Sequence, residues 1–170
     1  MHVKVNQTDV NREFRRLDKF VREVSQHAYV AAKSSADEYT ELVKTGIAVT
    51  TEPSFAPRWA PLSPVTVMRK KAHQDEFWAE TLGIFRAIEV KIISKTISFI
   101  HLFAGIRAEK DQAAFERAAR NEYGLGLGPA RPLFEPAKDF MAPMTGTGRR
   151  LRKRELFLQA LRNAKRRVYK

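Results

Sequence analysis

The sequence predicts an α+β fold, in which a long N-terminal helix precedes a small antiparallel sheet, short helices and a basic C-terminal helix. Three observations support this prediction. Apolar and small residues recur every three or four positions from about residue 9 to residue 45, as in an amphipathic helix. β-branched and aromatic residues gather between residues 84 and 107, as in strands. From residue 149 onward the spacing is helical again, with lysines and arginines between the apolar positions.

The chain of 170 residues is long enough for one domain with a packed core. We predict a single α+β domain over residues 1–148 and a separate helix over 149–170. The absence of cysteine excludes a disulfide scaffold, a thiolate nucleophile and cysteine-based metal sites. The N-terminus has no apolar signal region and no window approaches 18 uninterrupted apolar residues, so we expect no membrane contact.

The net charge of +12 is unevenly distributed, because residues 149–170 contribute +9 and the first 148 residues only +3. A basic segment of this kind binds either a polyanion such as DNA or an acidic surface of a protein partner, and the residues leave both open. The candidate contact residues are Arg149, Arg150, Arg152, Lys153, Arg154, Arg162, Lys165, Arg166 and Arg167.

The first predicted helix spans about 9–45, which is roughly 55 Å at 1.5 Å per residue and longer than a small domain is wide. In the middle of the helix the residues of its apolar stripe are small, Ala and Ser, which lets another backbone approach closely. The helix therefore lies either across its own sheet or along a neighbour such as another subunit. The stripe consists of Phe14, Leu17, Val21, Val24, Ala28, Ala31, Ser35 and Leu42.

The segment around Trp59 combines a large apolar anchor with two prolines. Pro61 and Pro64 each push the preceding residue into an extended conformation. Ser63 stands where an N-cap belongs, ahead of a proline at the first helical position, so a short helix is expected over 64–72. The alternatives are a functional arm and a loop attached to the core by its indole.

The middle of the chain is expected to contain a single helical turn that stops at Gly83, followed by two antiparallel strands over about 86–93 and 96–105. Ser94 and Lys95 are predicted to form the turn between them. A helix over 109–121 follows.

Three glycines alternate with larger residues from Gly124 to Gly128, and Pro129 ends the run. No strand precedes them and no Gly-Lys-Ser/Thr follows, so a phosphate-binding loop is not indicated. We predict a mobile loop or an interface loop. The stretch from Leu133 to Met141 is expected to form a short strand or a helical turn.

The sequence predicts no enzyme, no cofactor and no metal site. The four histidines are scattered, and no metalloprotease, nucleophile-elbow, P-loop or Rossmann motif is present. A catalytic function would require a pair of carboxylates that meet only in the fold, such as Glu80 with Asp111. The inventory of elements is instead typical of a protein that contacts other proteins.

Several segments, in order, resemble a family of tailed-phage proteins. Trp59, Pro61, Leu62, Ser63 and Thr66, with Lys70 and Lys71 behind them, are similar to a W-x-P-L-S-x-x-T…K segment of tail-completion and head–tail joining proteins of long-tailed bacteriophages, the HK97-type neck proteins and Mu-type virion morphogenesis proteins. The later segments are Thr81-Leu82-Gly83, Asn121-Glu122-Tyr123-Gly124, Pro129-Ala130-Arg131-Pro132-Leu133-Phe134, where Leu133 replaces the usual Phe, and Pro136-Ala137.

The resemblance covers about residues 55–140. It implies a twisted antiparallel sheet with the long helix packed on it, and a structural virion protein of the neck that assembles in the host cytoplasm. Such proteins form rings, commonly hexameric, with other neck, connector or tail-tube proteins as partners. The basic tail would face genomic DNA or an acidic partner surface. A first helix longer than the family's and an unusually basic end are departures from the pattern. A nucleic-acid-binding protein that uses the basic C-terminal helix is the alternative.

The resemblance also implies which residues are structural or form interfaces. Arg131, held between two prolines, either contacts a carboxylate of the next subunit or forms an intrachain ion pair that shapes its loop. We further predict that Trp59 is buried against the 129–134 bend. The full set is Trp59, Pro61, Leu62, Thr66, Gly83, Tyr123, Gly124, Pro129, Arg131 and Pro132.

Overall fold

The computed structural model confirms the predicted α+β class. It describes residues 7–49, 52–69, 78, 83–96, 99–125, 128–141, 158, 162 and 166. The elements are α1 (Gln7–Ile47), α2 (Pro64–Arg69), α3 (Gly83–Ala87), β1 (Ile88–Lys95), β2 (Ile100–Ile106), α4 (Gln112–Tyr123) and α5 (Phe134–Met141).

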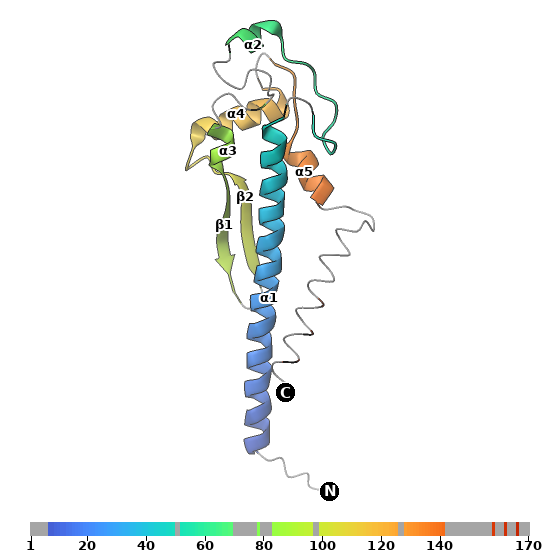
Figure 1. Cartoon of the computed structure of the whole chain (residues 1–170). Coiled ribbons are helices and arrows are strands. Elements are labelled where there is room, and N and C mark those ends of the chain that lie inside the picture. The colour runs from blue at the N-terminus through green and yellow to red at the C-terminus, as the bar shows by residue number, and fades with distance from the viewer. Residues whose placement is uncertain are drawn as a thin grey trace.

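The long helix α1 is confirmed and contains 41 residues, two more at each end than predicted. Its C-terminal part lies beside the hairpin and α5, while its N-terminal part extends beyond them (Figure 1). The first alternative, a helix packed on its own sheet, therefore holds for the C-terminal part. The buried residues of α1 are Ser25, Thr40, Val43, Gly46 and Ile47.

The two strands pair antiparallel, with Ile88 opposite Ile106 and Lys95 opposite Ile100. The predicted turn at Ser94–Lys95 is wrong, because both residues belong to β1. The turn lies later, where Thr96 N donates to Phe99 O at 2.7 Å. Lys95 keeps the strand on α1, since its Nζ lies 4.2 Å from the centre of the Tyr29 ring.

The helix boundaries follow from capping. Ser63 caps α2 as predicted, accepting from Thr66 N at 3.1 Å. The prediction that Gly83 stops a turn is wrong, because Gly83 begins α3, and the first strand consequently starts at 88 rather than 86. Helix α4 begins at 112 rather than 109, because Asp111 Oδ1 accepts from Ala114 N at 2.9 Å. This contact also gives Asp111 a structural role, and Glu80 lies outside the described residues.

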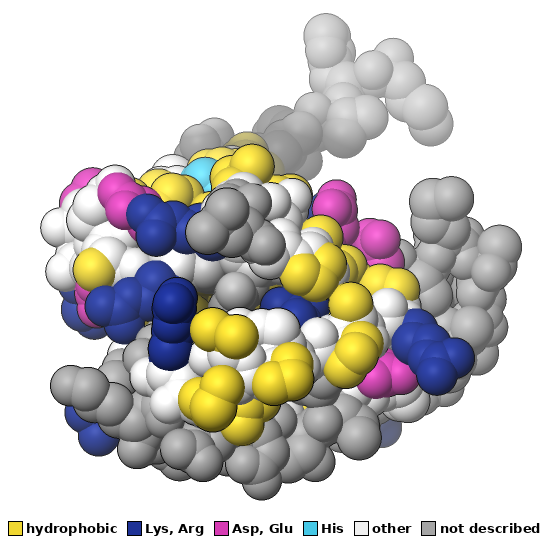
Figure 2. Space-filling view, turned by 90° about the horizontal axis from the view of Figure 1, so that it is seen from above, with side chains coloured by type: hydrophobic (Ala, Val, Ile, Leu, Met, Phe, Trp, Pro, Cys, Tyr) yellow, Lys and Arg dark blue, Asp and Glu magenta, His cyan; other side chains and the backbone are white. Residues whose placement is uncertain are grey.

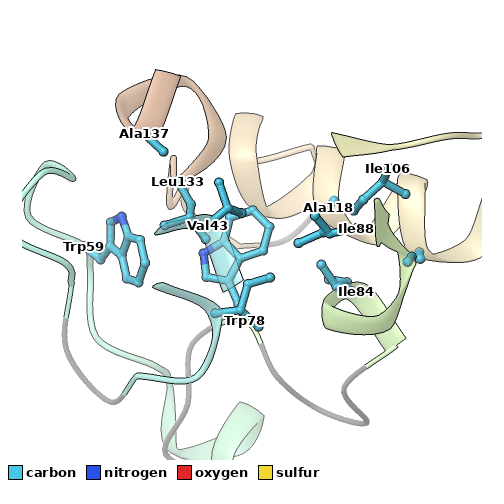
Figure 3. Close-up of a cluster of buried hydrophobic side chains, with 12 residues drawn as sticks. Val43, Trp59, Trp78, Ile84, Ile88, Ile106, Ala118, Leu133 and Ala137 are labelled. Carbon is cyan, nitrogen blue, oxygen red and sulfur yellow. The ribbon is translucent and has the colours of Figure 1, made fainter. Parts of the chain in front are cut away.

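One hydrophobic cluster joins α1, α3, the two strands, α4 and α5 (Figure 3). Val43 and Ile47 of α1 and Leu133, just before α5, are fully buried at its centre. The two tryptophans, Trp59 and Trp78, belong to the same cluster. Side chains from α3, both strands, α4 and α5 complete it, namely Ile84, Ala87, Ile88, Ile106, Ala114, Ala118 and Ala137.

Candidate functional site

The predicted contact between Trp59 and the 129–134 bend is confirmed. Trp59 is buried, and its Nε1 donates to Pro132 O at 3.1 Å. Its indole belongs to the same buried cluster as Leu133 (Figure 3). The proline-rich segment around Trp59 and the later bend, which are more than 70 residues apart in the sequence, therefore form one corner.

Arg131 holds this corner from within. Its Nε donates to Ala60 O at 3.1 Å and its Nη2 to Pro61 O at 3.3 Å, and its backbone N donates to Asn121 O at 2.7 Å. The residue is buried, and burial lowers the pKa of the Arg131 guanidinium. The side chain is thus directed inward rather than offered to a neighbouring subunit. Arg131 thus shapes its own loop through the backbone carbonyls of Ala60 and Pro61, whereas the second alternative predicted an ion pair.

Glu122 is the residue that sequence reasoning missed. Its carboxylate is buried and accepts hydrogen bonds from three successive amides, Leu133 N at 2.7 Å, Phe134 N at 3.0 Å and Glu135 N at 2.9 Å. These are the unpaired donors at the start of α5, and the next residue, Pro136, has no N–H to satisfy. A negative charge is also favourable at a helix N-terminus.

A sequence signal for this cap did exist. Helix α5 begins after Leu133, which has no side chain that can accept a hydrogen bond, so its first amides need another acceptor, either water or a group from elsewhere in the chain.

Tyr39 links α1 to the same site. Its hydroxyl donates to Phe134 O at 3.2 Å. Burial, together with the negative charge of Glu122, raises the pKa of Tyr39 to about 12. The corner therefore connects α1, α4 and α5 through polar groups as well as through the core.

Gly124 closes the loop that ends in this corner. It ends α4 in the left-handed conformation, with φ of 67°. A Cβ at this position would lie 2.8 Å from Ala130 N, which is too close for any side chain. Both observations explain a glycine here without a phosphate ligand.

The structure brings most predicted structural residues to this corner, but not all. Tyr123 and Pro129 are exposed beside Gly124, and Leu62 is half-buried next to Pro61. Thr66 lies on α2, where its hydroxyl and that of Ser63 are 2.8 Å apart. Figure 2 shows apolar side chains spread over the face at this end of the molecule, with lysines and arginines among them.

Two of the nine predicted basic contact residues, Arg162 and Arg166, are described, and both are helical and exposed. The other seven, Arg149, Arg150, Arg152, Lys153, Arg154, Lys165 and Arg167, lie outside the described residues.

An apolar recess of about 260 Å³ lies between β2 and α4, and Phe103, Gly105, Phe115 and Tyr123 are among the residues that line it. Within the described ranges, no three histidine or acidic side chains are grouped so that they could hold a metal ion. None of the helices described is both long and apolar enough to cross a membrane.

Comparison with known proteins returns no matching family model, no matching curated protein and no matching solved structure.

Proposed function

We propose that this chain is a structural virion protein of a tailed phage, a tail-completion, tail-terminator or head–tail joining component that forms a ring in the neck. Its partners would be copies of itself and other neck, connector or tail-tube proteins. The ordered motifs around Trp59, Gly124 and Arg131 support this proposal. The observation that carries it is the uncovered apolar surface of the β-hairpin.

The far end of the hairpin exposes large apolar side chains. Ile92, Ile93 and Phe99 are 45%, 50% and 54% exposed. The strand register shifts between Ile92 and Ser94, so Ile93 is an extra residue in β1. Such a bulge turns neighbouring side chains away from strict alternation, which accounts for two adjacent exposed isoleucines. Surface of this kind is typical of a protein–protein contact.

The hairpin also has open edges. Among the described residues the sheet contains only β1 and β2, so each strand has one hydrogen-bonded neighbour. Unpaired edges readily accept a strand from another chain. Because one edge belongs to β1 and the other to β2, pairing β1 of one copy with β2 of the next is a head-to-tail contact that can close into a ring.

The segment before α4 holds the other end of the hairpin in place. Glu89 of β1 accepts hydrogen bonds from Lys110 and Arg107, which precede α4. These bonds, first that of Lys110 and then that of Arg107, lower the pKa of Glu89. These contacts restrain one end of the hairpin, so that its exposed end has a defined position for a contact between subunits.

The test is the oligomeric state of Ile93→Lys, with Met68→Lys as the matched control. Met68 is 73% exposed, but it lies on α2, away from the hairpin. We expect native mass measurement to find a ring-sized species for the unmodified chain and for Met68→Lys, and mainly monomer for Ile93→Lys. A strict monomer at high concentration that binds no tail or connector protein would overturn the proposal.

Nucleic-acid binding is a second candidate, because α1 also presents a row of cations. Arg12, Arg15, Arg16 and Lys19 line one surface of its N-terminal part. Together with the basic tail, this row would bind phosphates with a steep salt dependence and no sequence preference. Removing residues 149–170 separates the two functions: DNA binding should fall while ring formation is kept. DNA binding that the truncation leaves unchanged would contradict this candidate.

A further inference from the structure

Helix α1 carries an apolar seam that is separate from its contact with the hairpin. Its steps alternate strictly between four and three residues, which is the heptad spacing of a coiled-coil seam. The seam residues are Val10, Phe14, Leu17, Val21, Val24, Ala28, Ala31 and Ser35.

The hairpin occupies a different face of the helix. Ser25 and Tyr29 contact the turn region of the hairpin, through Thr96 O and the Lys95 ammonium. These two residues follow the seam positions Val24 and Ala28 by one residue each, which places them about 100° around the helix. The seam is therefore not the surface that packs on the sheet.

The N-terminal end of the seam is open. Phe14, Leu17 and Val21 are 66%, 48% and 42% exposed. All three precede Ser25, which contacts the turn region of the hairpin, and the N-terminal part of α1 extends beyond the hairpin (Figure 1). We call residues 7–24 of α1 the arm. No described segment of the chain buries the apolar stripe of the arm.

We propose that the occupant of this seam is the chain's own basic tail, residues 149–170, which folds back as a helix antiparallel to the arm. The tail has a matching seam at Leu151, Leu158, Leu161 and Val168, spaced by seven, three and seven residues. Leu158, Arg162 and Arg166 are helical in the structure. In proteins most helical stability comes from the packing of an amphipathic face, so a helix that contains these three residues calls for an apolar surface to pack on.

The chain is long enough for this arrangement. Helix α5 lies beside the C-terminal part of α1, where Tyr39 contacts Phe134, and it ends at Met141. The nine residues 142–150 span up to about 30 Å when extended. The distance along α1 from Tyr39 to Val24 is about 22 Å. The tail can therefore reach the arm and run along it toward its N-terminus.

Tethering favours the tail over the arm of a second copy. In a parallel pair of arms the flanking positions place Glu13 of one copy against Asp18 of the other, which is repulsive. The arm itself carries five Lys/Arg and four Asp/Glu, and Glu13 and Asp18 already pair with Arg16 and Arg22, so the +9 of the tail gives no net charge attraction to the arm. The tail is favoured by its tethering. Its linkage to the same chain supplies an effective concentration in the millimolar range, which a separate copy lacks. The pairing does not depend on the proposed ring.

Disulfide trapping in the full chain tests the proposal, because the chain has no cysteine of its own. Leu17→Cys is combined in turn with Leu158→Cys and with Leu161→Cys, and the controls replace Leu17→Cys by Lys19→Cys on the opposite side of the arm. We expect at least one Leu17 pair to form an intrachain disulfide, at monomer mass, at least tenfold faster than its Lys19 control. Rates equal to those of the controls would overturn the proposal, as would a disulfide between chains from Leu17→Cys alone.

Hydrogen exchange supplies a readout that does not require a chosen register. Leu17→Glu should increase amide exchange over residues 151–168 at least tenfold, whereas Lys19→Glu should leave it unchanged. Tail amides that already exchange at the unprotected rate in the unmodified chain would contradict the docking. Native mass measurement of the same variants separates this result from ring formation.

Discussion

The corner depends on one carboxylate that caps a helix from another part of the chain. Glu122 lies on α4, yet it accepts from the amides of Leu133, Phe134 and Glu135, all of which begin α5. Replacing it with a residue of the same shape should expose how much of the fold depends on these bonds.

Glu122→Gln should lower the free energy of unfolding by about 2–3 kcal/mol. The new side-chain NH₂ group faces backbone N–H donors and cannot accept from them, and the negative charge that strengthens the three hydrogen bonds is lost. The matched control is Glu116→Gln, on the same helix but exposed and paired with Arg120, which should change stability by less than about 0.5 kcal/mol. Urea unfolding followed by circular dichroism measures both. Equal losses for the two variants would show that the buried cap has no special role.

The two tryptophans offer a second comparison at the level of single atoms. Trp59 Nε1 donates to Pro132 O, whereas Trp78 Nε1 is buried without an acceptor in the described part of the structure. Both are nearly fully buried, so their losses of packing are similar.

Trp59→Phe should therefore cost about 1 kcal/mol more in free energy of unfolding than Trp78→Phe, since only the first leaves a partly buried carbonyl, Pro132 O, without its donor. Each variant keeps one tryptophan, so chemical denaturation can be followed by the remaining fluorescence and by circular dichroism. A larger loss for Trp78→Phe would contradict the assigned hydrogen bond.

At the level of elements, the loop after α4 depends on the backbone conformation of a single glycine. Gly124→Ala should lower the free energy of unfolding by about 2 kcal/mol, because alanine is strained at positive φ and its Cβ would press on Ala130 N. Gly128→Ala is the control, since the nearest atom to its added Cβ is Arg131 Nη1 at 4.0 Å. Thermal unfolding of both variants measures the difference. Equal midpoints would exclude a conformational requirement at Gly124.

The sequence predicted the elements whose causes are local. The periodicity of α1, the Ser63 cap and the β-branched strands each depend on residues a few positions apart, and all three are present. The burial of Trp59 against the 129–134 bend was also predicted. The hairpin turn was predicted too early, because Ser94 and Lys95 still pair with β2, and Lys95 contacts Tyr29 of α1, which is distant in the sequence.

The cap on α5 could not be located for a similar reason. Its acceptor, Glu122, is separated from the amides by a loop, and short-range sequence patterns do not predict the path of that loop. The inward direction of Arg131 likewise depends on carbonyls that lie 70 and 71 residues away. Local chemistry thus predicts elements, while the polar contacts of the corner follow from tertiary structure.

At the scale of the whole molecule, α1 is fastened to the rest of the corner through Tyr39. In the unfolded chain its phenol ionises near the ordinary value of 10.0, whereas in the folded protein its pKa is about 12. Between these values the unfolded chain releases a proton that the folded chain retains, so ionisation favours unfolding. The stability that depends on neutral Tyr39 is therefore complete below pH 10 and is lost as the pH rises toward 12.

Tyr39→Phe isolates this contribution. At neutral pH the variant should be about 1 kcal/mol less stable, because the hydrogen bond to Phe134 O is lost. Its disadvantage should shrink as the pH rises from 10 to 12, since only the unmodified chain carries the ionisable phenol. Urea unfolding at a series of pH values measures the difference between the two chains, which cancels the titration of the other tyrosines and of the lysines.

Because burial is the larger cause of the raised pKa of Tyr39, Glu122→Gln should reduce this pH dependence without abolishing it. A difference that stays constant to pH 12 would mean that Tyr39 is not buried against the corner and that α1 is held by apolar contacts alone.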